Sequence, residues 1–391
     1  MKKFIVFAIA LTLGLAMSAQ PYNKAVAYDQ AHFDRMQSIL DNPTTPKNVK
    51  YVFTEATDLN LIGKGFETPN PYARVDTVKY KGFTKGENQQ CRCSAGLAVL
   101  FKTDATSISV KTVWGQLYSS VSTMGIAYRG YDLYIRNAKG EWQWAASNAT
   151  KPEKGGDNLV LIKDMDGSVH ECLLYLPMYC EVYSCKIGVN EGAKIESLES
   201  PFRHKIVFHG SSYTQGISSS RSGMTYPMQF MRHTGLQVIP MGMSGNCKMQ
   251  PYYCDVMCDL EADAYVFDAF SNPDYKMIRE RLVPFIDRLV AAHPGKPIIF
   301  QQTIYRENRN FSITYNIREQ AKQDMASTIF KNEIFPNPKY KDVYFIQTNA
   351  CEKGSHEYSV DGTHPDDHGY YLWSKSIEKP ILKILAKYNI K

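Results

Sequence analysis

Residues 205–216 read KIVFHGSSYTQG, a short apolar run followed at once by a turn rich in glycine and serine. The apolar run fits one buried strand, and the turn leads into a helical pattern over 224–233. Further apolar runs of strand length follow at 237–241, 264–269, 297–301 and 342–346. Strands that alternate with helices predict a parallel sheet covered by helices on both faces. Reactive groups then gather at the carboxyl ends of the strands.

The chain before residue 192 has a different pattern, without a convincing amphipathic helix. Residues 107–113 alternate polar and apolar side chains, and 132–142 fits a hairpin around a glycine-containing turn. Further strand candidates are 96–102, 170–176 and 183–189. Short strands at regular spacing predict a β-sandwich.

The polar stretch 192–201 is the expected linker between the two patterns. We therefore expect a β-sandwich domain over residues 21–195 and an α/β domain over residues 196–391. Each is long enough to bury its own core.

The first twenty residues have the pattern of a secretory signal peptide. Lys2 and Lys3 precede an apolar run over 4–17, and small residues around it mark a cleavage region, namely Ala16, Ser18 and Ala19. The run is shorter than the ~20 residues that a spanning helix needs, and no later segment qualifies. We therefore expect an exported bacterial protein, periplasmic or secreted, without a membrane span.

Charge and cysteine content exclude some classes of protein. The formal net charge is +6 without a basic cluster, which argues against a nucleic-acid partner. The nine cysteines do not have the spacing of a metal site, so we expect no metal. An exported chain can form disulfides, and several pairings among Cys172, Cys180 and Cys185 stay open.

Two polar motifs lie where the α/β pattern expects reactive groups. Ser212 stands in the turn directly after the first strand, where a backbone N–H can face an oxyanion. Asp361 precedes His364 by three residues, close enough to accept its Nδ1–H and leave Nε2 for a hydroxyl. The turn could also be a loop without chemistry, and His364 could be a surface residue at the start of a helix.

Two more candidates follow the second and third strands. Gly245 can expose a backbone N–H, and Asn272 offers a side-chain NH₂; both suit a tetrahedral oxyanion. Gly245 could instead only permit a positive φ, and Asn272 could cap the next helix. Four candidates at successive strand ends favour a single site.

These residues resemble the four sequence blocks of the SGNH (GDSL) hydrolases, in chain order across the C-terminal half. The strings HGSSYTQG (209–216), SGMTY (222–226) and MSGNCKM (243–249) resemble one branch of that family. Its members carry an N-terminal β-domain marked by the string Gly-x-Asp-Leu-Tyr, which Gly130-Tyr-Asp-Leu-Tyr134 matches. The resemblance covers both expected domains.

The resemblance implies a three-layer α/β/α, flavodoxin-like hydrolase domain after the β-sandwich. It implies Ser212 as nucleophile, His364 as base and Asp361 as its partner, without a cofactor. The N–H groups of Ser212 and Gly245 and the Asn272 side chain would form the oxyanion hole.

The chain departs from the family pattern at two positions. Ser211 replaces the acidic residue before the nucleophile, so two adjacent hydroxyls compete for that role, with the spacing to Thr214 and Gly216 favouring Ser212. Phe270 replaces the usual glycine two residues before Asn272.

The expected activity is hydrolysis of small acyl esters, acetyl esters above all, with a small molecule or a polysaccharide as the substrate. Four aromatic residues could stack on sugar rings or equally fill the core of the sandwich: Trp114, Tyr118, Trp142 and Trp144. Alternatives are a lipase or thioesterase for longer acyl chains and a non-catalytic glycan-binding protein on a hydrolase fold.

Overall fold

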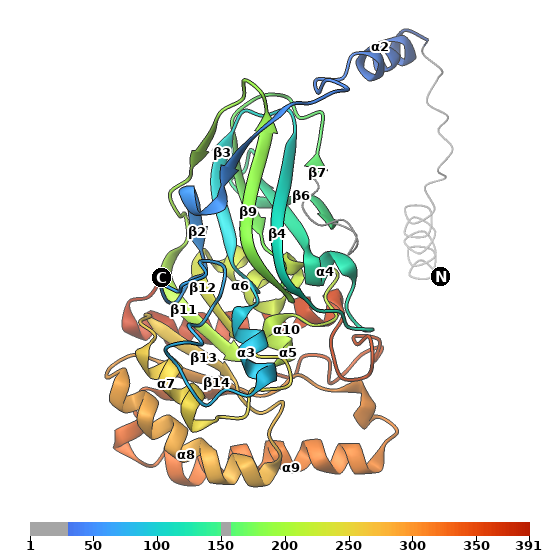
Figure 1. Ribbon diagram of the computed structural model, residues 1–391. Coiled ribbons are helices and arrows are strands. Elements are labelled where there is room, and N and C mark those ends of the chain that lie inside the picture. The colour runs from blue at the N-terminus through green and yellow to red at the C-terminus, as the bar shows by residue number, and fades with distance from the viewer. Residues whose placement is uncertain (1–29, 150–157) are drawn as a thin grey trace, which may run out of the picture. The chain divides into compact units, whose positions relative to one another are not determined.

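The computed structural model describes residues 30–149 and 158–391 (Figure 1). The expected signal peptide, residues 1–20, lies outside the described residues. The chain separates after Pro46 into two units. The first contains helix α2 (Gln30–Asp41), which has no buried residue, and the second comprises residues 47–391. No helix in the described ranges has the length and apolar character needed to cross a membrane.

The C-terminal half forms a parallel sheet of five strands in the order β12-β11-β13-β14-β15. The strands are β11 (Arg203–Gly210), β12 (Leu236–Gly242), β13 (Ala264–Asp268), β14 (Ile298–Gln301) and β15 (Val343–Ile346). Numbered along the chain, this order is 2-1-3-4-5, the flavodoxin-like one. All five predicted strands and the predicted fold class are confirmed.

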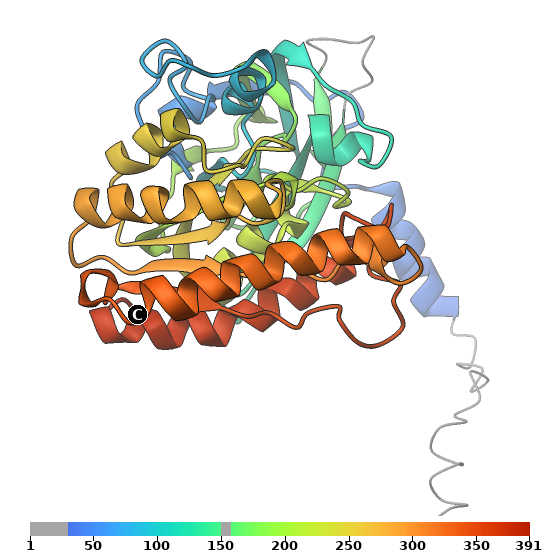
Figure 2. The same ribbon diagram turned by 90° about the horizontal axis from the view of Figure 1, so that it is seen from below.

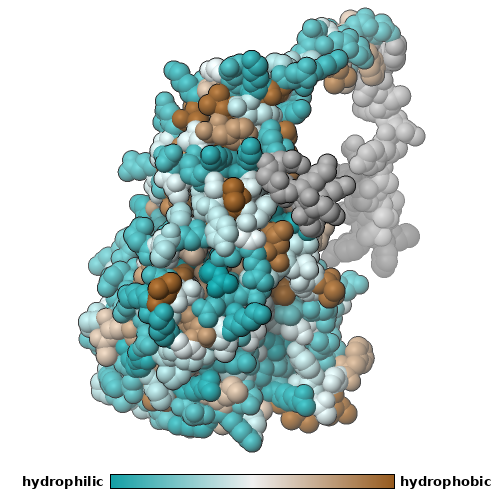
Figure 3. All heavy atoms as spheres, in the orientation of Figure 1, coloured by the Kyte–Doolittle hydropathy of each residue, from teal (hydrophilic) through white to brown (hydrophobic). Residues whose placement is uncertain are grey.

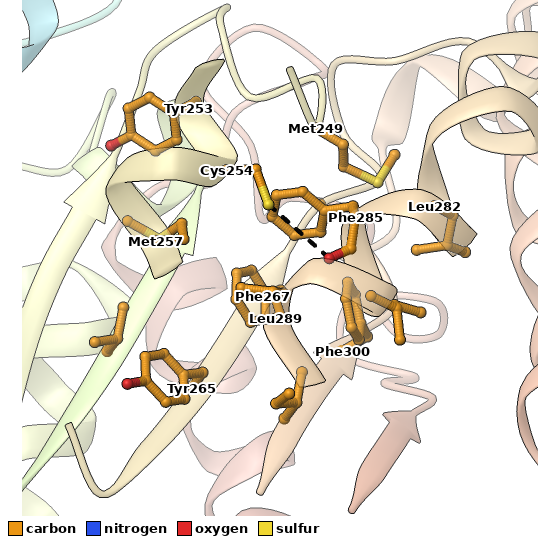
Figure 4. Close-up of a cluster of buried hydrophobic side chains, with 14 of the residues drawn as sticks. Met249, Tyr253, Cys254, Met257, Tyr265, Phe267, Leu282, Phe285, Leu289 and Phe300 are labelled. Atoms are coloured by element: carbon orange, nitrogen blue, oxygen red, sulfur yellow. Dashed lines mark hydrogen bonds between the residues drawn. The ribbon is translucent and has the colours of Figure 1, made fainter. Parts of the chain in front are cut away.

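Helices cover both faces of this sheet because its strands alternate apolar side chains toward each face. Ile206 and Phe208 pack with α6 (Tyr226–Thr234) and α10 (Asp367–Leu385). Val207, between them, packs on the other face with α7 (Pro251–Asp259), α8 (Tyr275–Ala292) and α9 (Ile313–Ile329). Figure 4 shows α7 and α8 side chains such as Met257, Phe285 and Leu289 against Phe267 and Phe300 of the sheet. Figure 2 shows the long helices α8, α9 and α10 from below.

Residues 51–197 form two antiparallel sheets. One has the order β1-β9-β4-β7, from β1 (Tyr51–Glu55), β9 (Cys180–Asn190), β4 (Ile108–Leu117) and β7 (Leu159–Ile162). The other runs β10-β3-β8-β5-β6, from β10 (Ile195–Ser197), β3 (Ala98–Thr103), β8 (His170–Tyr175), β5 (Gly130–Arg136) and β6 (Trp142–Ala149), with β2 (Asn60–Ile62) beside β3. Side chains from both sheets share one core, so the predicted β-sandwich is confirmed.

The structure differs from the expected pattern in two places. The expected linker 192–201 contains β10, which pairs with β3, so the sandwich extends past residue 195. Two short helices, α3 (Lys85–Arg92) and α4 (Gly125–Arg129), lie in the region where we expected none. Each is eight residues or shorter, too short to show a hydrophobic period in the sequence.

The sandwich and the α/β half share a hydrophobic core. The second sheet turns Leu100, Leu173 and Tyr175 toward Phe202 and Met228 of the α/β half. Residues 47–391 form one compact unit, in which this shared cluster lies beside the core between the two sheets of the sandwich. On the face seen in Figure 3, hydrophobic residues lie in small separate groups among hydrophilic ones.

The string Gly130–Tyr134 supplies several of the polar contacts across this junction. Asp132 has no exposed surface and accepts hydrogen bonds from Arg221 Nη1 (3.0 Å), the Gly223 N–H (2.8 Å) and Ser147 Oγ (2.7 Å). The hydroxyl of Tyr134 also accepts a hydrogen bond from Arg221. The motif therefore joins the sandwich to the segment 221–223.

We expect Asp132→Ala to lower the free energy of unfolding by about 3 kcal/mol, because it leaves the half-buried Arg221 guanidinium without its carboxylate. Urea unfolding followed by circular dichroism measures this loss. Asp166→Ala, which removes an exposed carboxylate paired with His170 in the same domain, is the control and should cost much less. Equal losses for the two variants would contradict a junction role for Asp132.

Candidate active site

The turn after β11 presents Ser212 at the start of the short helix α5 (Ser212–Gln215). Gly210 ends β11, and a Cβ there would lie 2.1 Å from Thr214 Oγ1, so only glycine permits this close turn. Gly216 ends α5 in the left-handed conformation at φ +106. Ser212 therefore lies at the carboxyl end of β11, beside the point between β11 and β13 where the strand order reverses.

Ser212, His364 and Asp361 come together in one hydrogen-bonded chain. His364 Nε2 lies 3.1 Å from Ser212 Oγ, and His364 Nδ1 lies 2.8 Å from Asp361 Oδ2. Because the carboxylate accepts, Nδ1 carries the proton and Nε2 is free to accept from the serine hydroxyl. The arrangement has the geometry of a nucleophile, a base and an orienting carboxylate.

Asp361 is held in its ionised form by its own loop. Burial would raise the pKa of its carboxyl, but hydrogen bonds from the His364 side chain and backbone outweigh it and lower the pKa below its usual value. The N–H groups of His364 (2.7 Å) and Thr363 (3.0 Å) both donate to Oδ1. The other carboxylate oxygen, Oδ2, therefore accepts the His364 Nδ1–H as an anion.

Tyr213, next to the serine, holds the histidine loop in place. Its hydroxyl donates to the Thr363 carbonyl (2.8 Å) and accepts from Arg306 Nε (2.6 Å). Arg306 is buried, pairs with Glu319 (2.9 Å) and donates to the Ser271 carbonyl (2.9 Å). This network joins segments about 150 residues apart in the chain. Tyr213 lies within the string 209–216 but was given no role from the sequence, and Arg306 belongs to no motif that the sequence analysis used.

Ser211, the competing hydroxyl, is fully buried and engaged elsewhere. Its Oγ donates to Asp268 Oδ2 (2.9 Å) and accepts from the Tyr213 N–H (3.3 Å), which caps α5. His364 Nε2 is hydrogen-bonded to Ser212, not to Ser211. The two adjacent serines therefore have different environments, one beside the imidazole and one beneath the turn.

Asp268 is a buried carboxylate that the sequence analysis did not single out. It ends β13 and accepts hydrogen bonds from Ser271 Oγ (2.8 Å) as well as from Ser211. It forms no ion pair with any described residue, and burial raises the pKa of its carboxyl. The carboxylate thereby ties the nucleophile turn to the segment that carries Asn272.

The three expected oxyanion donors differ in how they are held. Asn272 Oδ1 accepts the Cys247 N–H (3.1 Å), which orients the amide and leaves Nδ2 available. Gly245 is exposed with φ +72, and Gln215 Oε1 supports its turn by accepting the Ser244 N–H (2.9 Å). Within the described part of the chain, the Ser212 N–H, the Gly245 N–H and Asn272 Nδ2 donate to no protein acceptor. The helix after Asn272 is capped by Asp274 instead.

Phe270, the second departure from the family pattern, fills the core. It is 4% exposed and packs on Phe300 with ring centroids 6.0 Å apart. The side chain that stands in place of the usual glycine therefore belongs to the hydrophobic cluster that includes residues of α8 and α9.

His209 is a buried neutral histidine. Its Nδ1–H donates to the Met241 carbonyl (2.8 Å), so Nε2 accepts from Cys247 Sγ (3.4 Å), and its ring stacks on Tyr253. Burial lowers its pKa from 6.5 to about 4. Of the other histidines, His356 pairs with Glu307 (3.0 Å) and the exposed His368 lies edge-on to Tyr358.

We expect the pKa of His209 to make the protein less stable in acid. A base whose pKa is lower in the folded than in the unfolded state stabilises the fold at pH values above its unfolded pKa, here 6.5. This stabilisation is lost as the pH falls toward 4. For His209 the loss in the free energy of unfolding is about 2–3 kcal/mol between pH 7 and 4.5. Urea unfolding at a series of pH values should show a smaller loss for His209→Gln than for the wild type. Parallel curves for the two proteins would contradict the assignment.

The four aromatic residues that could stack on sugar rings have different surroundings. Trp114 packs against its core, Tyr118 against a smaller cluster, and Trp142 stacks on Phe202, while Trp144 is 50% exposed. Tyr131 is buried with its hydroxyl on Thr112 (2.7 Å), so it does not line the site. No disulfide joins the nine cysteines, all of which lie in the described ranges.

A three-layer α/β/α domain with a serine, histidine and aspartate at the strand ends defines a serine-hydrolase class of protein. Residues 203–383 match the model of the GDSL-like lipase/acylhydrolase family, and residues 49–195 match that of the GxDLY N-terminus of SGNH-type esterases. The chain belongs to this family, and it is a hydrolase that acts on esters.

Solved structures agree with this assignment. A GDSL-like lipase from Bacteroides ovatus is 36% identical, with 86% of this chain and 98% of that chain covered and a TM-score of 0.82. A salicylyl-acyltransferase from a tetracycline biosynthetic pathway (15% identity, 86% and 98% covered, TM-score 0.63) shares the fold. So does a family two carbohydrate esterase from Clostridium thermocellum in complex with cellohexaose (12% identity, 75% and 93% covered, TM-score 0.54). No curated protein sequence matches the chain.

Proposed function

We propose that the protein is an exported serine esterase that removes small acyl groups, acetyl above all, from carbohydrate. The observation that carries the esterase mechanism is the chain of hydrogen bonds from Asp361 through His364 to Ser212. The carbohydrate part is supported by the similarity in fold to a carbohydrate esterase that binds cellohexaose. Export is supported by the signal-peptide pattern of residues 1–20.

The reaction proceeds in two steps. His364 Nε2 takes the Ser212 proton as Oγ bonds to the ester carbonyl carbon, and the carbonyl oxygen becomes an oxyanion. The N–H groups of Ser212 and Gly245 and Asn272 Nδ2 stabilise that charge. The bond to the alcohol oxygen then breaks, and His364 returns its proton to this oxygen. Water repeats the sequence on the acyl-enzyme and releases the carboxylic acid, with Asp361 stabilising the imidazolium in both steps.

Acetate release and chain-length selectivity test the proposal. We expect the purified full chain to release acetate from acetylated oligosaccharides, and to hydrolyse p-nitrophenyl acetate with a higher kcat/KM than the butyryl and octanoyl esters. A preference for octanoyl esters would favour a lipase or thioesterase and overturn the acetyl assignment. Labelling by a fluorophosphonate, abolished in Ser212→Ala, separates an enzyme from a glycan-binding protein, which would not react.

A further inference from the structure

A groove of about 610 Å³ lies between the sandwich and the loops that carry the catalytic residues. One wall is the sandwich segment 121–124, which precedes α4, and the other comprises Ser218, Ser220, Val360 and residues 366–368. We call this space the seam groove. It is assigned to no step of the mechanism above.

The walls of the seam groove are attached to the catalytic loops by hydrogen bonds. The Val360 N–H donates to the His364 carbonyl (2.9 Å), and the Ile217 N–H donates to the Ser212 carbonyl (3.0 Å). The sandwich wall is fixed in turn, because Thr123 Oγ1 accepts the Ser218 N–H (3.0 Å). The groove is therefore held beside the nucleophile and the base by the same backbone that positions them.

Ser218 combines a strained backbone with a buried hydroxyl. Its backbone is left-handed (φ +67), a conformation that is strained for any residue other than glycine and that persists where the surrounding structure enforces it. The residue is 7% exposed, and its hydroxyl has no hydrogen-bond partner among the residues that the structure describes. A buried hydroxyl without a partner costs free energy unless a ligand or water supplies one.

Both acidic residues of the groove accept hydrogen bonds from neighbouring segments. Asp366 accepts the Gly369 N–H (2.8 Å) as the cap of α10, and Asp367 accepts the Ser220 N–H (2.8 Å). The other polar groups of the lining are the exposed imidazole of His368 and the hydroxyls of Ser122, Thr123, Ser218 and Ser220.

The apolar part of the lining is open to solvent. Val121 is fully exposed, and Met124 and Val360 are 59% and 51% exposed. Apolar side chains together with a few hydrogen-bonding groups suit a ligand that has both C–H surface and hydroxyls, as a sugar ring does.

Combining these observations, we propose that the seam groove binds the alcohol part of the ester, a sugar residue, and that the sandwich segment 121–124 sets specificity for it. His364 must reach the leaving oxygen to protonate it, so the alcohol extends on the side of the histidine loop, where the groove lies. The carbonyl oxygen faces the opposite donors, Gly245 and Asn272. This inference rests on the proposed function.

Binding measured without turnover tests the groove. The Kd for partially acetylated xylotriose or cellotriose is measured by isothermal titration calorimetry in full-length Ser212→Ala, which cannot turn the sugar over. Two groove variants are made in this background, Val121→Ala together with Met124→Ala, and Ser218→Ala. Each should raise the Kd at least about fivefold. Alanine adopts φ +67 no more easily than serine, so Ser218→Ala removes only the hydroxyl. Val169→Ala, at another exposed valine of the sandwich, is the matched control and should leave the Kd within twofold.

The outcomes separate this inference from the proposed function. Unchanged affinity in both groove variants, or no binding of either oligosaccharide, overturns the groove. If Ser212→Ala binds the sugars through the groove but the wild type releases no acetate from them, the proposed function fails and the groove stands. Thermal melting of each variant shows whether it is folded, and in the wild-type background kcat/KM should fall more for the acetylated sugars than for p-nitrophenyl acetate.

Discussion

Ser212→Ala is expected to lower kcat for p-nitrophenyl acetate by about 10⁴-fold or more, because no other hydroxyl lies in contact with His364 Nε2 among the described residues. Ser211→Ala is expected to keep at least about a tenth of the activity. Its hydroxyl caps α5 and rests on Asp268, so its loss should cost about 1 kcal/mol of stability rather than the nucleophile. Initial rates and urea unfolding measure the two effects.

The same experiment can reverse the assignment. If Ser211→Ala loses activity completely while Ser212→Ala retains it, Ser211 is the nucleophile and the turn rearranges in the working enzyme. His364→Ala should resemble Ser212→Ala in kcat, and the double variant should lose little more, because nucleophile and base act as one unit.

The second large effect concerns the buried carboxylate beneath the turn. Asp268→Ser removes the acceptor of Ser211 and Ser271, and we expect kcat to fall about 10–100-fold and stability to fall by about 2–3 kcal/mol. Ser211→Asp places two carboxylates side by side in a buried site and should be at least as damaging. KM should change less than kcat, since neither residue contacts the substrate.

Combining the two substitutions exchanges the carboxylate and the hydroxyl between positions 268 and 211, whose side chains form a hydrogen bond of 2.9 Å from Ser211 Oγ to Asp268 Oδ2. We expect Ser211→Asp with Asp268→Ser to recover most of the stability and activity, a large coupling in the double-mutant cycle. Additive losses in the double variant would show that Asp268 acts only as a packed side chain. Recovery would explain how the chain tolerates a serine where its family carries an acid.

The class of fold could be read from the sequence because its signal is local. The apolar run of β11, the glycine-rich turn and the strand–helix alternation each depend on neighbouring residues, and all five predicted strands of the sheet are present. The helix α9 was not predicted, because it buries few residues and lacks a regular apolar stripe.

The candidate residues Ser212, Gly245, Asn272, Asp361 and His364 were likewise visible, each at a strand end or in a short motif. The sequence also determined the order of these residues along the chain. It favoured Ser212 over Ser211 only through the spacing to Thr214 and Gly216, because both hydroxyls lie in the same turn and differ by one position.

Only the tertiary structure decided that choice. Asp268 comes from a neighbouring strand and takes the Ser211 hydroxyl, and Tyr213 and Arg306 bring the histidine loop, 150 residues away, onto Ser212. The junction formed by Asp132 and Arg221, and the seam groove next to it, also depend on contacts between distant segments. Such contacts leave no periodic trace in the sequence, since burial and hydrogen bonding between remote residues arise only when the chain is folded.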